Sequence, residues 1–420
     1  MLDDPPSPLV RGAPIPGSRY ASREFSALEW ERLWTRVWLL AGHVARLPTT
    51  GTYFTFDVGP ESLLVTRGDD GQVRAFYNVC QHRGHVLCRT EEGTVAAFEC
   101  PYHQWRYRLD GSLASAPGAG VLICGTLETV RLREIACEVR LGFIWVTMSP
   151  EPPAIDAFLA PVADEIAVYR PELFSPASEV TVEVACNWKT SVDVNNEGYH
   201  LRTLHPELLE VADDTAARER LCGPHSTISL PLGAAAHGSP AEGTITPRLR
   251  DFMGAMGLDP ASFHGTAGDV RAALMGAVRA RATADRVDLA ALPDDALVEK
   301  RQFHIFPNVQ LNFTPRSLEV YRHRPHGSDP LATLFDDQFY ERRAVNAPPR
   351  LRKPRRIKHG EASLGPVMGP DVDLLPHLTR GMASRGFAGL RLSEREGCIR
   401  HMHEVLDAYL FGGAVLDAQR

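Results

Sequence analysis

Two cysteines and two histidines stand at metal-ligand spacing in the first third of the chain. Cys80-x-His82 is followed by 17 residues and then by Cys100-x-x-His103. Two thiolates and two imidazoles are the donors that a four-ligand metal site needs. Each pair comes after a strand-like run, and the gap between the pairs is long enough for a hairpin to return the second loop beside the first. The spacing therefore predicts a metal centre held by two loops.

Three interpretations of this set compete. A structural zinc ion accepts two Cys and two His, and a Rieske [2Fe–2S] centre binds two Cys on one iron and two His on the other. The third interpretation is packing cysteines beside surface histidines. The flanking residues favour the Rieske centre, because they resemble the Rieske ferredoxin pattern C-x-H-R-G followed by C-P-x-H-x-W. The matching residues are Cys80, His82, Arg83, Gly84, Cys100, Pro101, His103 and Trp105.

Other residues of the two loops narrow the resemblance. The quinol-oxidising branch of the family carries an additional cysteine in each loop, and this pair forms a disulfide; here those positions are His85 and Tyr102. The match is therefore to the oxygenase and ferredoxin branch. Gln104 departs from the glycine that is usual in that branch. The other cysteines are expected to be small buried side chains: Cys88, Cys124, Cys137, Cys186, Cys222 and Cys398.

A second group of metal-binding side chains lies in NWKTSVDVNNEGYHLRTLHPE, residues 187–207. It holds His200 and His205, and Glu197 precedes His200 by three residues. On a helix Glu197 and His200 share a face, so Glu197 can accept the second N–H of the imidazole, as carboxylates do beside metal-bound histidines. Pro206 indicates that the helix ends there, which lets His205 turn back toward His200. The alternative is a pair of solvated histidines near a helix end.

Beside the Rieske pattern, E-x-x-H-x4-H after N-W-K resembles the large subunit of Rieske non-haem iron oxygenases. The resemblance implies that His200 and His205 bind a mononuclear Fe(II) and that Glu197 links this iron to a Rieske cluster. Most members have Asp at that position, and Glu resembles the branch that acts on quaternary amines such as carnitine. Asp193, four residues before Glu197, is expected either to support this link or to be an acid on the helix surface.

A facial triad of two histidines and one carboxylate needs a third ligand. The candidates are Asp371, Asp373 and the pair Asp336 and Asp337. The family pattern has an Asp at the start of a helix, then Q-x-G or Q-R-G, then S-R-G-F. Asp371 has T-R-G at 379–381 and S-R-G-F at 384–387 at the matching offsets. We therefore favour Asp371; the runner-up, Asp373, is otherwise an ordinary first-turn acid.

The resemblance implies the catalytic α subunit of a Rieske mono- or dioxygenase. Such a terminal oxygenase uses O2, and electrons relayed through the cluster, to hydroxylate or oxidatively demethylate a small aromatic or alicyclic compound or a quaternary amine. The chain has no G-x-G-x-x-G turn after a strand, so a separate NAD(P)H-dependent reductase, with or without a ferredoxin, is expected. The family also implies a homotrimer or a higher multiple of three. Two other interpretations stay open: a Rieske electron-transfer protein without oxygenase activity, and a zinc-stabilised helix-grip binding protein.

The elements that must position these residues fall into two regions. Between residues 51 and 148, short β-rich runs alternate with turns such as Asp70-Gly71 and Asp110-Gly111, which is typical of an all-β domain. Later segments mix strands and helices. We predict an α+β protein in which, by the resemblance, an N-terminal all-β Rieske domain is inserted near the start of a larger helix-grip (START/Bet v 1-like) catalytic domain with an antiparallel sheet. The expected boundaries are an arm and helix over 1–45, the Rieske domain over 46–150 and the iron domain over 151–420.

Individual elements are predicted from apolar spacing and turn residues. They are an extended arm over 1–20, a helix over 22–41, a linker at 149–156, a strand at 179–186, a helix over 188–204, helical stretches near 206–221 and 269–282, strands at 301–313 and 317–323, and helices at 371–385 and 393–411. Alternate residues from Phe306 to Asn312 share one face, and either face of that strand is a candidate cavity wall. The basic, proline-interrupted run over 342–358 is expected to be a solvated loop or a docking surface for an acidic electron donor.

Composition excludes several classes of protein. The 420 residues carry a formal net charge of −7, which argues against a nucleic-acid binder held by phosphate contacts. Contents of 44% hydrophobic and 23% charged residues indicate a globular chain with a buried core. No apolar run suits a membrane span, and the first residues, MLDDPPSPLV, lack the apolar core of a signal peptide. We therefore expect a cytoplasmic protein without membrane contact, whose cysteines stay reduced unless they bind metal.

Overall fold

The computed structural model describes residues 5–120, 122–123, 125–350 and 352–412. The chain forms two compact units. The smaller comprises Trp30–Leu159 with His326–Ser328, and the larger comprises the residues before Trp30, Ala160–Pro325 and the residues from Asp329 onward. Residues 5–29 thus pack with segments that follow residue 160. The predicted domain limits at residues 45 and 150 stay predictions. No helix within the described ranges is long and apolar enough to cross a membrane.

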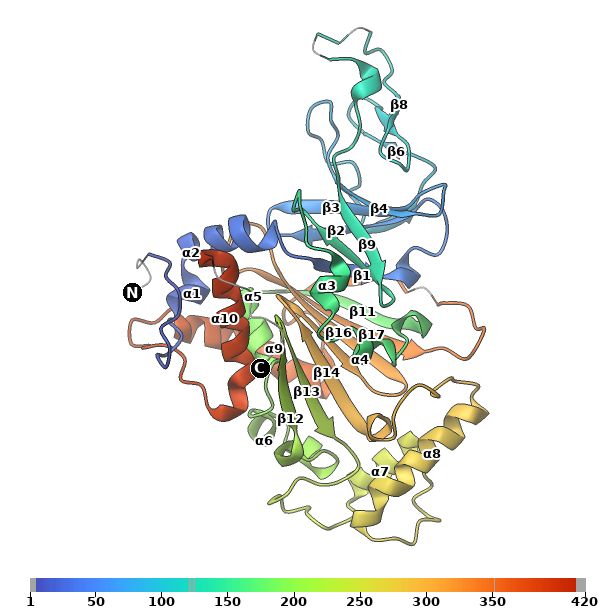
Figure 1. Cartoon of the computed structure of the whole chain (residues 1–420), viewed down its shortest axis with the longest axis vertical. Helices are drawn as coiled ribbons and strands as arrows, with labels where there is room; N and C mark the ends of the chain where they lie inside the picture. Colours follow the sequence, from blue (N-terminus) through green and yellow to red (C-terminus); the bar gives the residue numbers. More distant parts are fainter. Residues whose placement is uncertain (1–4, 121, 124, 351, 413–420) are drawn as a thin grey trace. The chain divides into compact units, whose positions relative to one another are not determined.

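The smaller unit is built of antiparallel strands (Figure 1). Its seven-stranded sheet has the order β1-β10-β9-β4-β3-β2-β5, and a three-stranded sheet has the order β6-β7-β8. The strands are β1 (Leu39–His43), β2 (Thr52–Val58), β3 (Glu61–Arg67), β4 (Val73–Tyr77), β5 (Glu92–Thr94), β6 (Phe98–Glu99), β7 (Arg106–Tyr107), β8 (Leu113–Ser115), β9 (Glu134–Arg140) and β10 (Phe143–Thr147). Both predicted turns are present: Gly71 (φ +78°) lies between β3 and β4, and Gly111 (φ +83°) lies between β7 and β8.

The loops that carry the Cys/His pairs leave this β structure at two points. The loop with Cys80 follows β4, and the loop with Cys100 joins β6 to β7. Both cysteines belong to one buried cluster, which also contains Trp105 and Tyr107. The strands therefore direct the two thiols toward the same apolar interior.

The N-terminal prediction is wrong in part. The expected arm ends in the short helix α1 (Ser18–Ala21), and the expected helix over 22–41 is only α2 (Arg23–Glu29) followed by a π-helical turn at Trp30–Trp34. Leu39–His43 is strand β1, fully buried and paired with β10. A short buried strand and a buried helix segment have the same apolar content, so periodicity does not separate them. The predicted linker is irregular up to residue 154 and then enters α3 (Ile155–Leu159), which α4 (Ala163–Ala167) follows.

The larger unit is organised around an eight-stranded sheet in the order β12-β13-β14-β15-β16-β17-β11-β18. Neighbouring strands are antiparallel, except that β18 is parallel to β11. The strands are β11 (Phe174–Val184), β12 (Arg218–Cys222), β13 (His225–Pro231), β14 (Glu299–Ile305), β15 (Val309–Phe313), β16 (Ser317–Pro325), β17 (Thr333–Arg342) and β18 (Arg355–Lys358). The predicted α+β class with an antiparallel catalytic sheet is confirmed.

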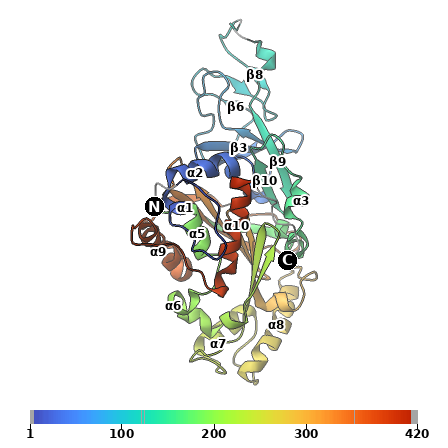
Figure 2. The ribbon, with the colours of Figure 1, turned by 60° about the vertical axis from the view of Figure 1, so that its left-hand side comes forward.

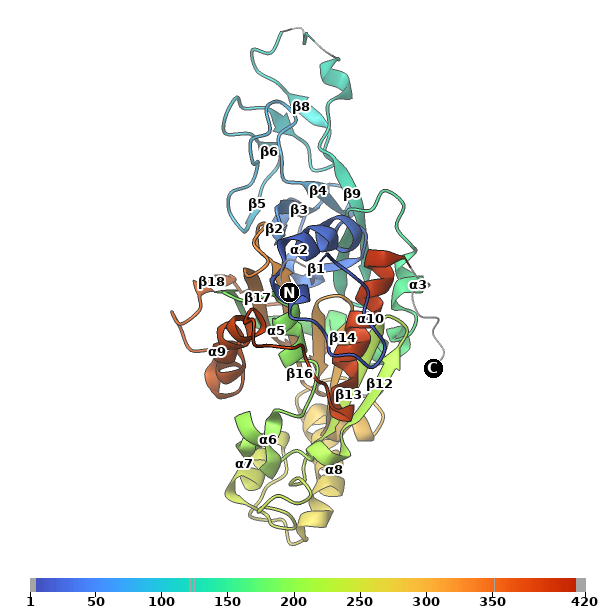
Figure 3. The ribbon, with the colours of Figure 1, turned by 90° about the vertical axis from the view of Figure 1, so that its left-hand side faces the viewer.

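Helices of about one to five turns accompany the sheet. They include α5 (Trp188–Val194), α6 (Leu201–Leu204), α7 (Pro247–Met256), α8 (Val270–Ala284), α9 (Gly365–Met382) and α10 (Gly397–Phe411). Helix α10 runs alongside β12 and β13 (Figure 2). Helix α9 lies beside α5 and β11 (Figure 3). Val180 and Phe335 on the sheet and Met368 and Val372 on α9 belong to one buried cluster, so apolar packing holds α9 against the sheet.

Five predictions for this unit need correction. The helix over 188–204 is interrupted at residues 195–200. The stretch near 206–221 consists of two 3-10 turns and strand β12, and 301–313 is a β14–β15 hairpin rather than one strand. Part of the basic run is not loop, because Arg342 ends β17 and 355–358 forms β18. Helix α9 begins at Gly365, six residues before the predicted start at Asp371. The prediction takes Asp371 as the first residue of the helix and leaves out the apolar turn that precedes it.

Buried polar contacts tie α5 to the sheet. His323 on β16 contacts Ser191 of α5 at 2.7 Å and Gln310 of β15 at 2.5 Å. Gln310 also donates to the carbonyl of Val192 at 3.3 Å. Burial lowers the pKa of His323 to about 3, so the ring is neutral at neutral pH. These contacts fix the end of α5 from which the histidine segment begins.

Candidate metal centres and the adjoining cavities

Each Cys/His loop is closed by the same pair of backbone hydrogen bonds. The N–H of Cys80 or Cys100 donates to the carbonyl five residues on, at 2.8 Å, and the cysteine carbonyl accepts the N–H four residues on, at 3.0 and 2.9 Å respectively. The residue at that fourth position has a positive φ in both loops: Gly84 at +75° and Gln104 at +57°. Gln104 therefore occupies a backbone conformation that favours glycine.

The donor atoms of the two loops have the chemistry that a cluster needs. Cys80 and Cys100 are each 2% exposed. The rings of His82 and His103 are 4.6 Å apart, and His82 stacks on Trp105 at 4.5 Å. Nδ1 of His103 is buried and has no hydrogen-bond partner among the residues that the structure describes, which leaves this nitrogen available to a metal.

Local electrostatics also suit metal binding. Desolvation, His82 and Arg83 lower the pKa of His103, which favours the neutral, ligating form of its ring. Burial raises the pKa of the Cys80 thiol, so this sulfur carries its proton until a metal replaces it. Tyr107 places its hydroxyl 3.3 Å from Sγ of Cys80 and accepts the Gln81 N–H at 3.0 Å. The phenol thereby braces the first loop at its cysteine.

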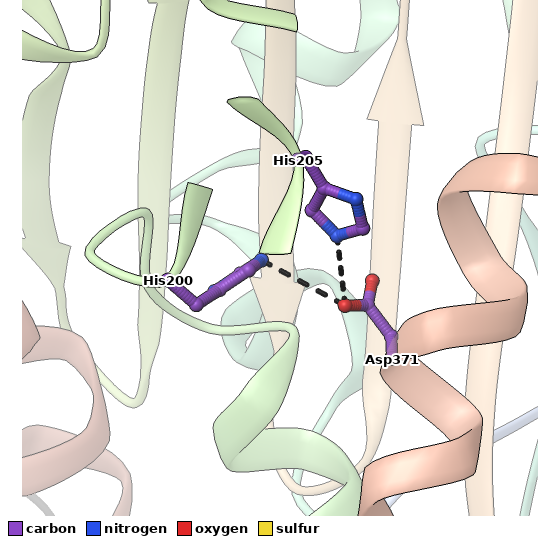
Figure 4. A group of neighbouring side chains, drawn as sticks. All are labelled: His200, His205 and Asp371. Atoms are coloured by element: carbon purple, nitrogen blue, oxygen red, sulfur yellow. Dashed lines mark hydrogen bonds and ion pairs between the residues drawn. The ribbon is translucent and has the colours of Figure 1, made fainter. Parts of the chain in front are cut away.

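In the larger unit the structure brings together His200, His205 and Asp371 (Figure 4). One ligand atom from each lies within 4.8 Å of the others. Nε2 of His205 is 2.9 Å and Nε2 of His200 is 3.9 Å from Oδ1 of Asp371. The two histidines flank the short helix α6, and Asp371 projects from α9. Nδ1 of His205 is buried and unpartnered in the described part of the chain. Two imidazoles and one carboxylate at this spacing suit a single octahedral metal ion with open positions.

Glu197 contacts His200 as expected, although no helix connects them. Oε1 of Glu197 lies 2.6 Å from Nδ1 of His200, and Oε2 accepts the backbone N–H groups of His200 and Tyr199. Residues 195–200 form turns in which the carboxylate folds back over the chain. Burial lowers the pKa of His200, but the hydrogen bond and charge of Glu197 and the charge of Asp371 outweigh it and raise that pKa. This contact directs Nε2 of His200 toward Asp371.

Asp193 has contacts of a different kind. Its side chain is 8% exposed, accepts a hydrogen bond from Tyr20 at 2.6 Å and lies 3.7 Å from Nε2 of His403. Asp193 is therefore a buried acid, and the alternative of a helix-surface position is wrong. No recorded contact in the described ranges joins it to Glu197, so its supporting role stays a prediction.

The other acids considered as third ligand lie apart from the histidines. Asp373 is 73% exposed and pairs with His359 at 2.8 Å. Asp336 is fully buried and binds Arg322 and Arg324 at 2.9 and 2.7 Å. Asp371 is the candidate beside both imidazoles, and burial raises its pKa despite the opposing effect of His200 and His205.

The remaining cysteines behave largely as expected. Cys186, Cys222 and Cys398 are buried, and Cys88 and Cys137 are partly buried; all five are free thiols. Cys124 lies outside the described residues. In the first loop pair, His85 and Tyr102 stand with their rings 6.3 Å apart.

A cavity of about 550 Å³ opens beside the three metal-type ligands. The sheet contributes Gln302, Asn312, Lys300 and Tyr321, so the face of β15 that carries Asn312 is the cavity wall. A second cavity of about 670 Å³ shares several wall residues with the first. They are Leu208, Leu230, Lys300, Tyr321, Val367 and Met368. Lys300 and Tyr321 were not among the residues expected at the site; alternation along β14 and β16 would have marked them once the inward face was known.

Two protein-family models match the chain. A Rieske [2Fe-2S] domain model matches residues 37–129, and a model for the ring hydroxylating alpha subunit (catalytic domain) matches residues 172–412, more than half of the chain. The chain belongs to the ring-hydroxylating alpha-subunit family. Its members' cofactors are a Rieske cluster and a mononuclear iron. The unpartnered Nδ1 of His103 fits the cluster, and the convergence of Nε2 of His200 and Nε2 of His205 on Oδ1 of Asp371 fits the iron.

Curated relatives in this family match over part of their length. The glycine betaine monooxygenase oxygenase subunit of Pseudomonas aeruginosa is 37% identical over 196 residues, which are 47% of this chain and 46% of that protein. The carnitine monooxygenase oxygenase subunit of Escherichia coli is 31% identical over 194 residues, 46% of this chain and 52% of that protein. The aligned segments thus span about half of this chain and about half of these relatives.

Solved structures share the fold over nearly the whole chain. A quaternary ammonium Rieske monooxygenase superimposes with a TM-score of 0.72 at 19% identity, covering 96% of this chain and 99% of that one. Naphthalene 1,2-dioxygenase from Rhodococcus sp. gives a TM-score of 0.67 at 17% identity, covering 94% of each chain. At these identities the likeness establishes the fold alone.

Proposed function

We propose that this chain is the terminal oxygenase component of a Rieske monooxygenase that acts on a quaternary amine. The observation that carries the proposal is the meeting of His200, His205 and Asp371 at the wall of a 550 Å³ cavity. The glycine betaine and carnitine monooxygenase subunits among the relatives support the substrate class. Aromatic and alicyclic substrates, and dioxygenation, are the wider possibilities within the family.

Each proposed ligand has a defined task. His200, His205 and Asp371 would hold the mononuclear iron, and Cys80, His82, Cys100 and His103 would hold the cluster. When bound, the two groups supply electron relay and O2 activation. Glu197 holds the His200 ring with Nε2 toward the iron position, and the cavity walls would hold the substrate beside that position. Asp193 is proposed to support Glu197 through α5.

The overall reaction fixes what partners must deliver. In demethylation one oxygen atom of O2 is inserted into a C–H bond of an N-methyl group. The other oxygen atom takes up two electrons and two protons and leaves as water. The resulting carbinol releases formaldehyde and the tertiary amine. The proposal includes a separate NAD(P)H-dependent reductase, with or without a ferredoxin, a homotrimeric assembly or a multiple of it, and a cytoplasmic location.

The test begins with metal and sulfide analysis of anaerobically purified protein, with EPR before and after dithionite. About three irons and two sulfides per chain, with a Rieske-type signal on reduction, are expected. Zinc without sulfide would overturn the proposal. Glycine betaine is then supplied with a reductase, NADH and O2, and formaldehyde is measured. His200→Ala is expected to abolish formaldehyde release while the cluster signal persists; a pure electron-transfer protein would keep its function in that variant.

A further inference from the structure

The walls of the two cavities are strongly acidic. They carry eight carboxylates and three Lys or Arg side chains. The acids are Glu197, Asp214, Glu219, Asp251, Glu319, Asp337, Asp371 and Glu394, and the bases are Arg248, Lys300 and Arg395. An excess of negative charge around a confined space favours cationic ligands.

Four of these eight acids pair with histidines or with basic side chains. Glu197 and Asp371 contact the histidines, and Asp214 pairs with Arg202 and Arg395. Glu319 pairs with Lys300 at 2.8 Å, which neutralises the one base common to both cavities. The charge of Lys300 is therefore balanced where a cation would bind against the wall that the two cavities share.

Asp337 differs from these acids. It is partly buried on β17, and within the described ranges no hydrogen bond or ion pair of its carboxylate is recorded. Burial and the nearby charge of Glu319 raise its pKa to about 6, and Lys300 only partly opposes them. Removal of a carboxylate from water without a compensating charge is unfavourable. A cationic ligand would supply that charge.

Three aromatic side chains line the same cavity as Asp337. Tyr321 is its direct partner across β16–β17, and Phe339 follows two residues later on β17. Phe252 of α7 lines the same cavity. Aromatic rings together with a carboxylate can bind an onium group, because such a group needs dispersion contacts and a counter-ion but no hydrogen-bond acceptor.

Tyr321 connects this wall with the iron site. Its side chain lines both cavities. Burial raises the pKa of Tyr321 well above its usual value, and the charges of Glu319, Asp337 and Asp371 add to the effect. The charges of both Asp337 and Asp371 therefore act on the phenol. A head group against this ring would lie on the wall that the two cavities share, next to the cross-strand partner Asp337.

The same sheet face also carries a buried side-chain amide, that of Asn312. Asn312 is 1% exposed and lines the first cavity, and neither of its side-chain polar atoms has a partner in the described part of the chain. Buried amides in folded proteins are nearly always hydrogen-bonded. The pair of cavities thus offers an unpaired carboxylate and an unpaired amide on one sheet face.

We propose that Asp337 and Tyr321 form the subsite for the cationic head group of the substrate, with Asp337 as its counter-ion. The inference rests on the proposed function, since it assigns one wall of the same substrate cavity. Phe339 and Phe252 complete the apolar side of the subsite. Asn312 is left to bind a polar group elsewhere on the substrate.

The subsite couples cation binding to a proton. With no ligand, Asp337 titrates near pH 6, and the cation prefers the ionised form. Affinity is therefore full above pH 7 and falls by up to about tenfold per pH unit below pH 6. The ionisable groups that face Asp337 are Lys300, Glu319 and Tyr321 on the sheet and Arg248 and Asp251 on α7. The pKa of Glu319 is lowered and that of Tyr321 is raised, so neither titrates between pH 5 and 8.

The test compares two ligands that differ by one charge. Glycine betaine and its carbon isostere 3,3-dimethylbutanoate have the same shape, but the isostere has carbon in place of the quaternary nitrogen. Calorimetric titration of the iron-loaded holoenzyme at pH 7.5 is expected to show at least about tenfold preference for betaine. In Asp337→Asn the preference is expected to fall below about threefold, and the dependence of betaine affinity on pH between 5 and 7 is expected to vanish.

Two further variants control this result. Glu341→Gln removes the same charge from β17, but Glu341 is exposed, pairs with Arg350 and lines neither cavity; its preference and pH profile are expected to match the wild type. Tyr321→Leu removes the ring and is expected to lower the preference even if Asp337→Asn fails to fold. Cluster absorbance and circular dichroism report folding in each case.

Three outcomes would overturn the inference: an equal loss of both ligands in Asp337→Asn, an unchanged preference in both variants, or wild-type enzyme that binds none of betaine, choline and tetramethylammonium. Failure of the proposed function would look different. If the enzyme binds betaine through Asp337 but releases no formaldehyde with reductase and O2, the subsite is supported and the proposed demethylase function is contradicted. An enzyme that oxidises an uncharged compound and binds no onium ion keeps the oxygenase proposal and loses the subsite.

Discussion

His205 and Asp371 stand 2.9 Å apart although 166 positions separate them in the chain. His205 ends the short helix α6, and Asp371 lies one turn and a half into α9. Their meeting depends on the sheet and on the packing of α9 against β11 and α5. The third position of the candidate iron site is therefore a product of tertiary structure rather than of a local motif.

Asp371→Ala is expected to empty the mononuclear site and spare the cluster. Iron should fall from about three to about two per chain with sulfide unchanged, because loss of the carboxylate leaves two imidazoles for the metal. Asp373→Ala is the matched control, since Asp373 lies two residues away but is exposed and pairs with His359. Iron analysis of both variants decides between the two acids: if Asp373→Ala loses iron and Asp371→Ala retains it, the assignment is wrong.

Glu197→Gln is expected to lower turnover more than iron binding. The amide still approaches Nδ1 of His200, but it carries no charge to favour the N–H tautomer that aims Nε2 at the iron position. Loss of such a partner costs about 10- to 100-fold in metal affinity or activity. Formaldehyde release and iron retention during dialysis measure the two effects separately. Unchanged turnover would show that the contact with His200 is not needed.

Much of this site could be predicted because its signals are local. Cys80, His82, Cys100 and His103 lie in two short loops, and Glu197 precedes His200 by three residues. Nevertheless, the contact between Glu197 and His200 arises in a turn at 195–200 and not on the predicted helix. A spacing of three residues brings side chains together in a tight turn as well as on a helix. The contact is therefore predicted correctly although the predicted backbone conformation is wrong.

The cavity could not be predicted in the same way. Alternation along 301–313 separates two faces but does not say which faces inward. The answer depends on where α5 and α9 pack, and the contacts that fix α5, such as His323 with Ser191, join residues 132 positions apart. Asp337 is a further example, because the sequence shows only two adjacent acids. Alternation along β17 places Asp336 beside Arg322 and Arg324 and places Asp337 on the cavity side.

Gln104→Gly is expected to stabilise the smaller unit slightly. Gln104 has φ +57° at the position that Gly84 occupies in the first loop. The left-handed conformation costs a residue with Cβ about 1–2 kcal/mol, and glycine adds about 0.5–1 kcal/mol of unfolded-state entropy. The net gain is about 0.5–1 kcal/mol, read as a higher midpoint of thermal unfolding followed at the cluster absorbance. Gln104→Ala keeps the strained φ and should give no gain; equal midpoints for both variants would refute the argument.

The buried pair Lys189–Glu29 is expected to matter for stability chiefly when one partner is removed. Nζ of Lys189 lies 2.6 Å from Glu29, both side chains are at most 2% exposed, and Glu29 also accepts the indole N–H of Trp188 at 3.1 Å. Glu29→Gln keeps an acceptor for Trp188 but strands a buried ammonium, and Lys189→Met strands a carboxylate. Each is expected to cost about 3–5 kcal/mol, whereas the double variant should recover most of the loss.

The single variant Glu29→Gln also carries a pH signature. Burial already lowers the pKa of Lys189, and Glu29 is the main opposing charge. Without that charge the pKa of Lys189 is lowered further in the folded state, whereas in the unfolded state it returns to about 10. At pH values between the folded and the unfolded pKa, the unfolded state binds one more proton, so the stability of Glu29→Gln should rise with pH, by up to about 1.4 kcal/mol per pH unit, relative to the double variant. Calorimetric unfolding at three pH values measures this difference, and parallel pH profiles would mean that Lys189 keeps its charge by another route.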